Sequence, residues 1–177
     1  HDQHELRRRW WISGMEWRAE AGEPSDPDEY LRRVTEVIGA PVSREEWVRI
    51  RAEATHARPA ALDAVRRAAE LGQVALLTNN GILIHHHLHE VAPELVPIMG
   101  REHMHASSFF GARKPDPLVF ERVLAHYGAA AADTFFADDL VENVAGAESI
   151  GITGHVYTDA GLLLAAIEAF AEKALAA

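Results

Sequence analysis

Short apolar runs are the most regular feature of the hydrophobic pattern along this chain. Such runs cover residues 74–77 and 134–137, residues 153–157 are a third strand candidate, and residues 104–107 are a weaker one. Short runs that end at polar or turn residues are typical of strands buried on both faces of a parallel sheet. The pattern therefore predicts strands at these four places.

Helical patterns alternate with these runs, over residues 58–71, 117–127, 141–150 and 160–174. Proline or aspartate stands at several helix starts and glycine at several helix ends, as capping requires. Strands that alternate with helices of this length imply βαβ crossovers. The sequence thus predicts an α/β fold with a doubly wound parallel sheet that helices cover on both faces.

The first third of the chain carries helix and turn signals only. Within residues 2–56, Asp26 and Ser43 each stand three residues before a glutamate, which marks the start of a helix. No strand pattern occurs before the first apolar run. We therefore divide the chain into a small helical cap lobe, residues 1–57, and an α/β core, residues 58–177.

The composition limits the kinds of function. The chain is 48% hydrophobic and 25% charged, which is ordinary for a globular protein, and its net charge of −10 leaves no basic surplus for nucleic acid. It contains no cysteine, which excludes disulfides and thiolate metal sites. It shows no apolar stretch of signal-peptide or membrane-span length. We expect a cytoplasmic monomer or homodimer that binds neither nucleic acid nor membranes, with small anionic substrates still possible.

Polar residues that directly follow the strands are the candidates for chemistry, because parallel sheets bind ligands beyond the carboxyl ends of their strands. The first run is followed by Thr78, Asn79, Asn80 and Gly81. This turn offers a hydroxyl and several backbone N–H groups to an anion. The same residues also make a good turn and helix cap without a ligand, so this segment alone leaves both interpretations open.

Two adjacent carboxylates, Asp138 and Asp139, follow the run at residues 134–137. Like charges side by side are costly unless a cation relieves them, and paired hard oxygens suit Mg²⁺. The alternative is that one aspartate caps the next helix and the other faces water.

A basic pair, Arg113 and Lys114, stands immediately before Pro115 and Pro117 at the start of a helix. The prolines stiffen the backbone around the lysine. A rigidly mounted lysine is what an electrostatic clamp on a phosphoryl group needs. Taken alone, a solvated Arg-Lys before a helix would be the default interpretation of this pair.

Together and in this order, the three segments resemble motifs two, three and four of the haloacid dehalogenase superfamily. Thr78-Asn79, the Lys-Pro-Asp-Pro segment that starts at Lys114, and Asp138-Asp139 with Asn143 carry the resemblance, which spans about residues 58–157. The last two segments are most similar to the bacterial sugar-phosphate phosphatases. That branch has a Rossmann-like core and a small helical cap, which fits the N-terminal helices. The metal-independent 2-haloacid dehalogenases look less similar, because they lack the paired aspartates.

The resemblance implies a role for each matching residue. Thr78 would hydrogen-bond a phosphoryl oxygen with help from the backbone N–H of Asn79, and Lys114 would offset charge on the nucleophile and on the phosphoryl group. Asp138 would bind Mg²⁺ directly and Asp139 directly or through water. Asn143 would support the loop that holds them. The reaction it implies is hydrolysis of a small phosphorylated metabolite, such as a sugar phosphate, through an aspartyl phosphate.

The nucleophilic aspartate of this superfamily belongs to motif one, an apolar strand that ends in Asp-x-Asp at the centre of the sheet. No segment of the 177 residues matches it. We favour a chain that continues ahead of His1 by about 20 to 30 residues, because a sheet without its central strand would expose an edge in its own core. A true fragment, a strand borrowed from a partner, and a non-catalytic binding or scaffold protein remain as alternatives.

Histidines and tryptophans are the other conspicuous side chains. For the histidines in residues 85–89 we favour a solvated helix face over a metal site, because consecutive positions on a helix cannot all face one ion. His103 and His105 alternate on a possible strand and are expected to be half-exposed. The four tryptophans are expected in the core of the helical lobe, although one of them or Arg18 could contact a substrate: Trp10, Trp11, Trp17 and Trp47.

Overall fold

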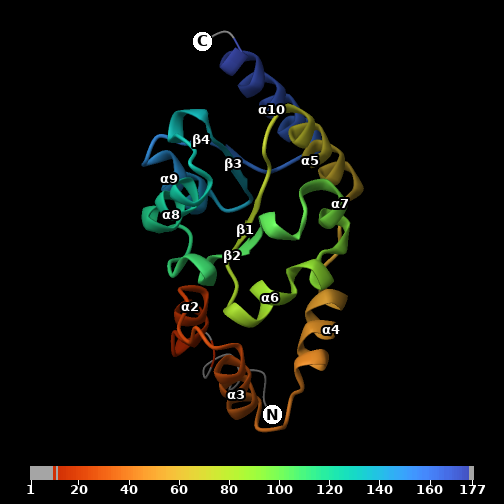
Figure 1. Cartoon of the computed structure of the whole chain (residues 1–177), viewed down its shortest axis with the longest axis vertical. Coiled ribbons are helices and arrows are strands. Elements are labelled where there is room, and N and C mark those ends of the chain that lie inside the picture. The colour runs from red at the N-terminus through yellow and green to blue at the C-terminus, as the bar shows by residue number, and fades with distance from the viewer. Residues whose placement is uncertain (1–9, 11, 176–177) are drawn as a thin grey trace. The chain divides into compact units, whose positions relative to one another are not determined.

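The computed structural model of the chain describes residue 10 and residues 12–175 (Figure 1). These residues divide into two compact units, each built from several segments. Unit 1 runs to His56 and also includes Ala75–Val96 and Gly100–Arg113, whereas unit 2 consists of Ala57–Val74, Pro97–Met99 and the chain from Lys114 onward. The chain first passes from unit 1 to unit 2 at residue 57, and it then returns to unit 1 for two strands. The assignment of residues 1–57 as a functional cap stays a prediction.

The helices of unit 1 are α2 (Met15–Glu20), α3 (Pro27–Ile38), α4 (Arg44–Ala54) and α6 (Ile82–Val91). Both capping residues expected from the sequence are confirmed. The Asp26 carboxylate accepts a hydrogen bond from the backbone N–H of Asp28 at 2.9 Å, and the Ser43 hydroxyl accepts one from Glu46 at 3.1 Å.

The strands of unit 1 form one parallel pair, β1 (Leu76–Thr78) with β2 (Met104–Ala106). Short helical turns lie between and after them: η2 (Pro93–Leu95), α7 (Val96–Met99), η3 (Arg101–His103) and η4 (Ser107–Phe110). The register places Thr78 opposite Ala106, so the carboxyl ends of the two strands coincide. β1 starts two residues later than its apolar run predicts and is only half-buried.

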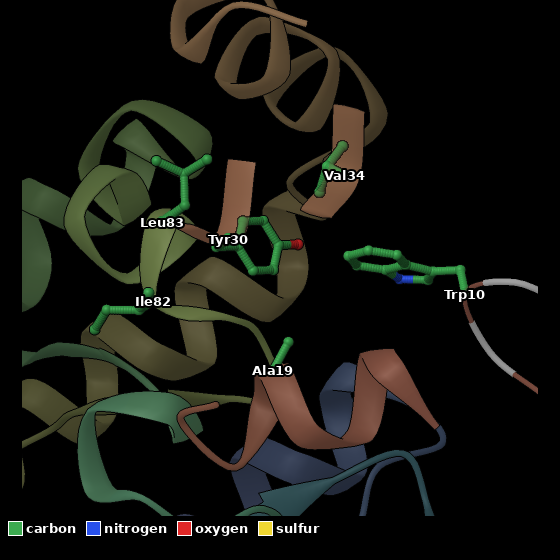
Figure 2. Packing of buried hydrophobic residues seen from close by; sticks show 6 residues of the cluster. All are labelled: Trp10, Ala19, Tyr30, Val34, Ile82 and Leu83. Atoms are coloured by element: carbon green, nitrogen blue, oxygen red, sulfur yellow. The ribbon is translucent and has the colours of Figure 1, made fainter. Parts of the chain in front are cut away.

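An aromatic and aliphatic core joins the helices of unit 1 (Figure 2). It contains Trp10, Ala19, Tyr30, Val34, Ile82 and Leu83. The ring of Tyr30 lies against Gly81, so closely that a Cβ atom at this glycine would stand 2.6 Å from Tyr30 Cε2. The turn after β1 is therefore held by direct contact with the core.

Unit 2 contains the second parallel pair, β3 (Phe135–Asp138) with β4 (Thr153–Val156). Its helical elements are α5 (Pro59–Leu71), α8 (Pro117–Tyr127), η5 (Ala131–Asp133), α9 (Val141–Glu148) and α10 (Ala160–Leu175). Helices α5 and α10 pack together, and Arg67 Nε lies 3.3 Å from Glu168 Oε1 across them. Helix α8 is capped by Asp116, as its sequence predicts.

Helices alternating with parallel strands confirm the predicted α/β class. The described residues form two separate two-stranded parallel sheets, β1 with β2 in unit 1 and β3 with β4 in unit 2, and not the single doubly wound sheet that the sequence predicts. Within that same part of the chain, no helix has the length and apolar character needed to cross a membrane.

Candidate functional site

A buried ion pair is the main feature of unit 2. Lys114 Nζ donates to Asp138 Oδ2 at 2.6 Å, and only 8% of each side chain is exposed. The other carboxylate oxygen, Oδ1, accepts hydrogen bonds from the Leu140 N–H at 2.9 Å and from Asn143 Nδ2 at 3.0 Å. The structure therefore brings together three residues that the sequence selected, at the carboxyl end of β3.

The surroundings of Asp138 keep it ionised. Burial raises the pKa of this carboxyl, but the hydrogen bonds from Lys114, Leu140 and Asn143 lower it by more, so the pKa lies below its ordinary value. The ammonium of Lys114 also lies 5.4 Å from the centroid of the Phe136 ring. A negative and a positive group are thus held side by side with little access to water.

The donor set at this place fits Mg²⁺. Only 8% of the Asp138 side chain is exposed and Asp139 is exposed, so two adjacent carboxylates combine a fixed group with one that reaches solvent. Mg²⁺ commonly binds one or two carboxylates and completes its shell with waters and substrate phosphate. Across the described residues, no group of three or more histidine, aspartate or glutamate side chains forms a fuller metal cage. Asp138 and Asp139 are therefore the residues that would hold the ion.

A glycine that the sequence analysis missed sets the position of the lysine loop. Gly146, inside α9, faces the backbone carbonyl of Pro115, and a Cβ atom at this glycine would stand 2.1 Å from that oxygen. The ring of Phe120 is the next neighbour, at 3.2 Å. A glycine inside a helix often marks such a close approach, which is the signal that could have revealed it.

The Gly146→Ala variant is expected to be destabilised by about 3 kcal/mol, because the added methyl meets a backbone atom that cannot rotate away. The Pro115 carbonyl must shift, which strains the loop that carries the neighbouring Lys114. Denaturant unfolding measures the loss of stability. Gly72→Ala is the control, since its Cβ would have nothing within 4 Å and its φ of −178° is extended backbone that any residue adopts. A Gly146→Ala protein as stable as the native one would contradict the predicted clash.

The other predicted phosphate-binding residues belong to unit 1. Thr78 ends β1, and its hydroxyl oxygen accepts a hydrogen bond from Asn80 Nδ2 at 2.9 Å. Asn80 Oδ1 in turn accepts one from an Nη2 group of Arg51 at 2.7 Å. Thr78 and Asn79 are both half-buried. The positions of Thr78, Asn79 and Asn80 after a parallel strand are those of a ligand-binding turn, and their roles stay predictions.

A second ion pair that the sequence did not reveal links α2 to the segment before Lys114. Arg113 Nε lies 2.5 Å from Glu20 Oε2, and the Ser107 hydroxyl donates to the Glu20 backbone carbonyl at 2.7 Å. The Arg113 guanidinium also lies 5.8 Å from the centre of the Trp17 ring. Residues far apart in sequence make these contacts, so no local sequence pattern predicts them.

The tryptophans do not all lie in the core. Trp10 is buried, Trp47 is half-buried, and 59% of Trp17 is exposed, which corrects the expectation for that residue. Trp17 lies on the outer face of α2, where the Arg113 contact covers part of it. Arg18 donates to the backbone carbonyl of Ser13. Trp11 lies outside the described residues.

The histidine-rich helix α6 is not solvated along its whole polar face. His86 is exposed as expected, but His85 is half-buried: its ring stacks on Phe109 at 4.7 Å, and its Nδ1 accepts the backbone N–H of Ala106 at 3.2 Å. His105 is buried, with 5% exposed, rather than half-exposed. The reason for both corrections is that α6 packs against β2 and η4.

His85 makes a pH-dependent contribution to stability. Burial, helped by His86, lowers the pKa of His85 to about 4 from its ordinary 6.5. Between these values the unfolded chain binds a proton that the folded chain does not, so the free energy of unfolding falls as the pH falls through this window. We expect a fall of about 1–2 kcal/mol after allowing for partial exposure.

Unfolding by urea at pH 7 and pH 4.5 measures this effect. The His85→Asn variant keeps an acceptor for Ala106 but cannot titrate, so its pH dependence should be flatter by that amount. His86→Asn, at an exposed position, should keep the native slope. Equal slopes in all three proteins would contradict the assignment to His85.

Comparison with known proteins gives a consistent result. The family model of the haloacid dehalogenase-like hydrolases matches residues 2–151. The chain is 27% identical over 172 residues to a phosphatase of Mycobacterium tuberculosis, a match that covers 89% of this chain and 74% of that protein. A shorter match, 44% identical over 54 residues, links it to a sesquiterpene phosphatase of Aspergillus oryzae; this match covers 30% of the chain and 28% of that protein.

Solved structures share the fold. A haloacid dehalogenase family enzyme from Bacteroides thetaiotaomicron superposes with a TM-score of 0.67 at 20% identity, over 89% of this chain and 86% of that one. The same enzyme has been crystallised with magnesium and inorganic phosphate. A haloacid dehalogenase-like hydrolase from Porphyromonas gingivalis superposes with a TM-score of 0.58 at 19% identity, over 87% of this chain and 82% of that one.

Proposed function

The chain belongs to the haloacid dehalogenase-like hydrolase family, and we propose that it is a Mg²⁺-dependent phosphohydrolase that acts on a small phosphorylated metabolite. The observation that carries this proposal is the buried pair of Lys114 and Asp138, which Asn143 holds from the other side. Sugar phosphates are the first substrate class that we propose.

Phosphoryl transfer explains why a lysine and an aspartate would be buried together. Taking two charges out of water is costly, and an ion pair rarely repays that cost as stability. A cation fixed where negative charge develops does lower the barrier of phosphoryl transfer. The group thus has two carboxylates for a metal and one lysine for the phosphate, and the attacking carboxylate must come from elsewhere.

Each residue has one task in the proposed reaction. The Thr78 hydroxyl and the Asn79 backbone N–H donate hydrogen bonds to a phosphoryl oxygen, and Lys114 balances charge on the attacking carboxylate and on the phosphoryl group. Asp138 and Asp139 hold Mg²⁺, which, when bound, stabilises charge on the phosphoryl oxygens. Asn143 keeps the Asp138 carboxylate in place. The aspartyl phosphate of the proposed reaction, which water then hydrolyses, would form on the motif-one aspartate, a residue that no segment of the 177 residues supplies.

The relatives support the proposal from two sides. The Mycobacterium tuberculosis protein is named a phosphatase, and the Bacteroides thetaiotaomicron enzyme binds magnesium and phosphate in crystals. The acidic composition, with no cysteine, is in keeping with a cytoplasmic monomer or homodimer whose partner is a small molecule rather than nucleic acid or a membrane.

Phosphate release from a panel of phosphate esters tests the proposal. We expect the full-length protein to release inorganic phosphate from one or more sugar phosphates at a rate well above the uncatalysed one. If Mg²⁺ and phosphate raise its thermal stability but no ester is turned over, the protein is a binding protein of this fold and the proposed activity is wrong.

A further inference from the structure

We propose that Arg51 is a positioning residue that acts on Thr78 through the Asn80 side chain. Arg51 fixes which end of the Asn80 amide faces Thr78, and it thereby directs the Thr78 hydroxyl hydrogen toward the substrate phosphate. The inference rests on the proposed function in one respect, namely that Thr78 binds the phosphoryl group.

The chain of hydrogen bonds has a direction. An Nη2 group of Arg51 can only donate, so the Asn80 atom that it contacts at 2.7 Å must be the carbonyl oxygen Oδ1. The amide nitrogen Nδ2 then faces Thr78 and donates to its hydroxyl oxygen at 2.9 Å. A hydroxyl has one hydrogen to donate. Because Thr78 acts as the acceptor here, that hydrogen stays available for a phosphoryl oxygen.

Without the guanidinium, the Asn80 amide has no such preference. The two ends of an asparagine amide have nearly the same shape, and the hydrogen-bonding partners decide which way it turns. Rotation of the Asn80 amide by half a turn would place Oδ1 beside the Thr78 hydroxyl. The hydroxyl would then donate its hydrogen to Oδ1. Thr78 would then present a lone pair to an anionic phosphate, which is repulsive.

Packing holds the backbone around Asn80 and the base of Arg51, so that rotation of the Asn80 amide is the main remaining freedom. The backbone after Asn80 is held because Gly81 contacts the ring of Tyr30, and the Asn80 carbonyl accepts the Ser108 N–H at 3.4 Å. On the other side, α4 packs against α6, which fixes the base of the Arg51 side chain.

The Arg51 guanidinium is held in a charged and partly buried setting. Burial raises the pKa of Glu16 above its ordinary value, and the charge of Arg51 partly opposes this rise, so the two groups lie within electrostatic reach. The Nε atom of Arg51 is buried, and it has no hydrogen-bond partner among the described residues. A buried donor without a partner is costly, and functional sites are where such costs are found.

A double-mutant cycle with inorganic phosphate as the probe tests the proposal. Phosphate affinity is measured by calorimetry, with Mg²⁺ present, on the full-length native protein and on R51M, T78V and T78V/R51M. We expect R51M to weaken phosphate binding by about 10- to 100-fold when Thr78 is present, and to have no further effect in T78V. R51K, which keeps a donor, should recover part of the affinity.

R49M is the matched control, because Arg49 lies on the same helix and forms an exposed pair with Glu53 at 2.7 Å. It should bind phosphate like the native protein. An equal loss from R51M with and without Thr78 would show that Arg51 acts only on the fold, and would overturn the inference. Native protein that binds no phosphate would overturn it as well. Binding with the expected cycle but no ester turnover would uphold the role of Arg51 and reject only the proposed activity.

Discussion

Replacing Lys114 with methionine, K114M, is expected to lower phosphate release by at least about 10²- to 10³-fold, the effect of losing one fixed donor to the transition state. Methionine keeps an apolar side chain of similar length and removes the ammonium, which lies 5.4 Å from the centroid of the Phe136 ring. Substrate affinity should change less than kcat, because the charge that Lys114 balances is largest in the transition state. Initial rates at saturating Mg²⁺ measure both parameters.

K114M should also cost stability. Asp138 is 8% exposed and would be left as a buried carboxylate without its cation, a change worth about 3–5 kcal/mol. K114M/D138N removes both charges and should recover most of the stability but none of the activity. K173M, at an exposed position of α10, should keep native activity and stability. Recovered activity in the double variant would mean that the lost rate of K114M was a folding defect.

The Asp138→Asn variant is expected to lose its response to Mg²⁺ and about 10²- to 10³-fold in rate. Asparagine has the shape of aspartate and can accept the hydrogen bond from Leu140, but it lacks the charge that binds a hard cation. Lys114 loses its counter-charge at the same time. Titration of activity with Mg²⁺ measures the effect.

Asp139→Asn provides the comparison for this variant. Asp139 is exposed, so its loss disturbs the fold less, and a water molecule can take its place beside the ion. We expect a weaker Mg²⁺ affinity and a rate between those of the native protein and of Asp138→Asn. A larger loss from Asp139→Asn than from Asp138→Asn would contradict the assignment of Asp138 as the main ligand.

Local signals predicted most of the helices of unit 2 correctly. The helix expected over residues 58–71 is α5 (Pro59–Leu71), and the one expected over residues 117–127 is α8 (Pro117–Tyr127). Proline at the start and glycine at the end fix helix bounds within a few residues, so the sequence is sufficient to place these helix ends. Apolar runs have no such end signals, and β1 accordingly starts two residues later than its run predicts.

Contacts between distant segments could not be predicted in this way. Arg51 and Asn80 are 29 residues apart, and no sequence pattern around either residue indicates a contact with the other. The clash that makes Gly146 necessary depends on Pro115, in another loop. His85 was expected on a solvated helix face, yet α6 packs on β2 and η4, and the ring of Phe109 stacks on His85. Sequence motifs thus identified Lys114, Asp138 and Asn143 as candidate site residues, and only the structure shows the contacts that hold them in place.

Metal dependence is the most direct test of the central claim, that the Lys114 and Asp138 pair is part of a Mg²⁺-dependent phosphohydrolase site. The full-length protein is freed of divalent ions with a chelator, and phosphate release from its best ester is followed as Mg²⁺ is added back. A Mg²⁺-dependent site gives no release above background without Mg²⁺ and a saturable return of activity with it. Equal activity in the presence of the chelator would contradict the claim.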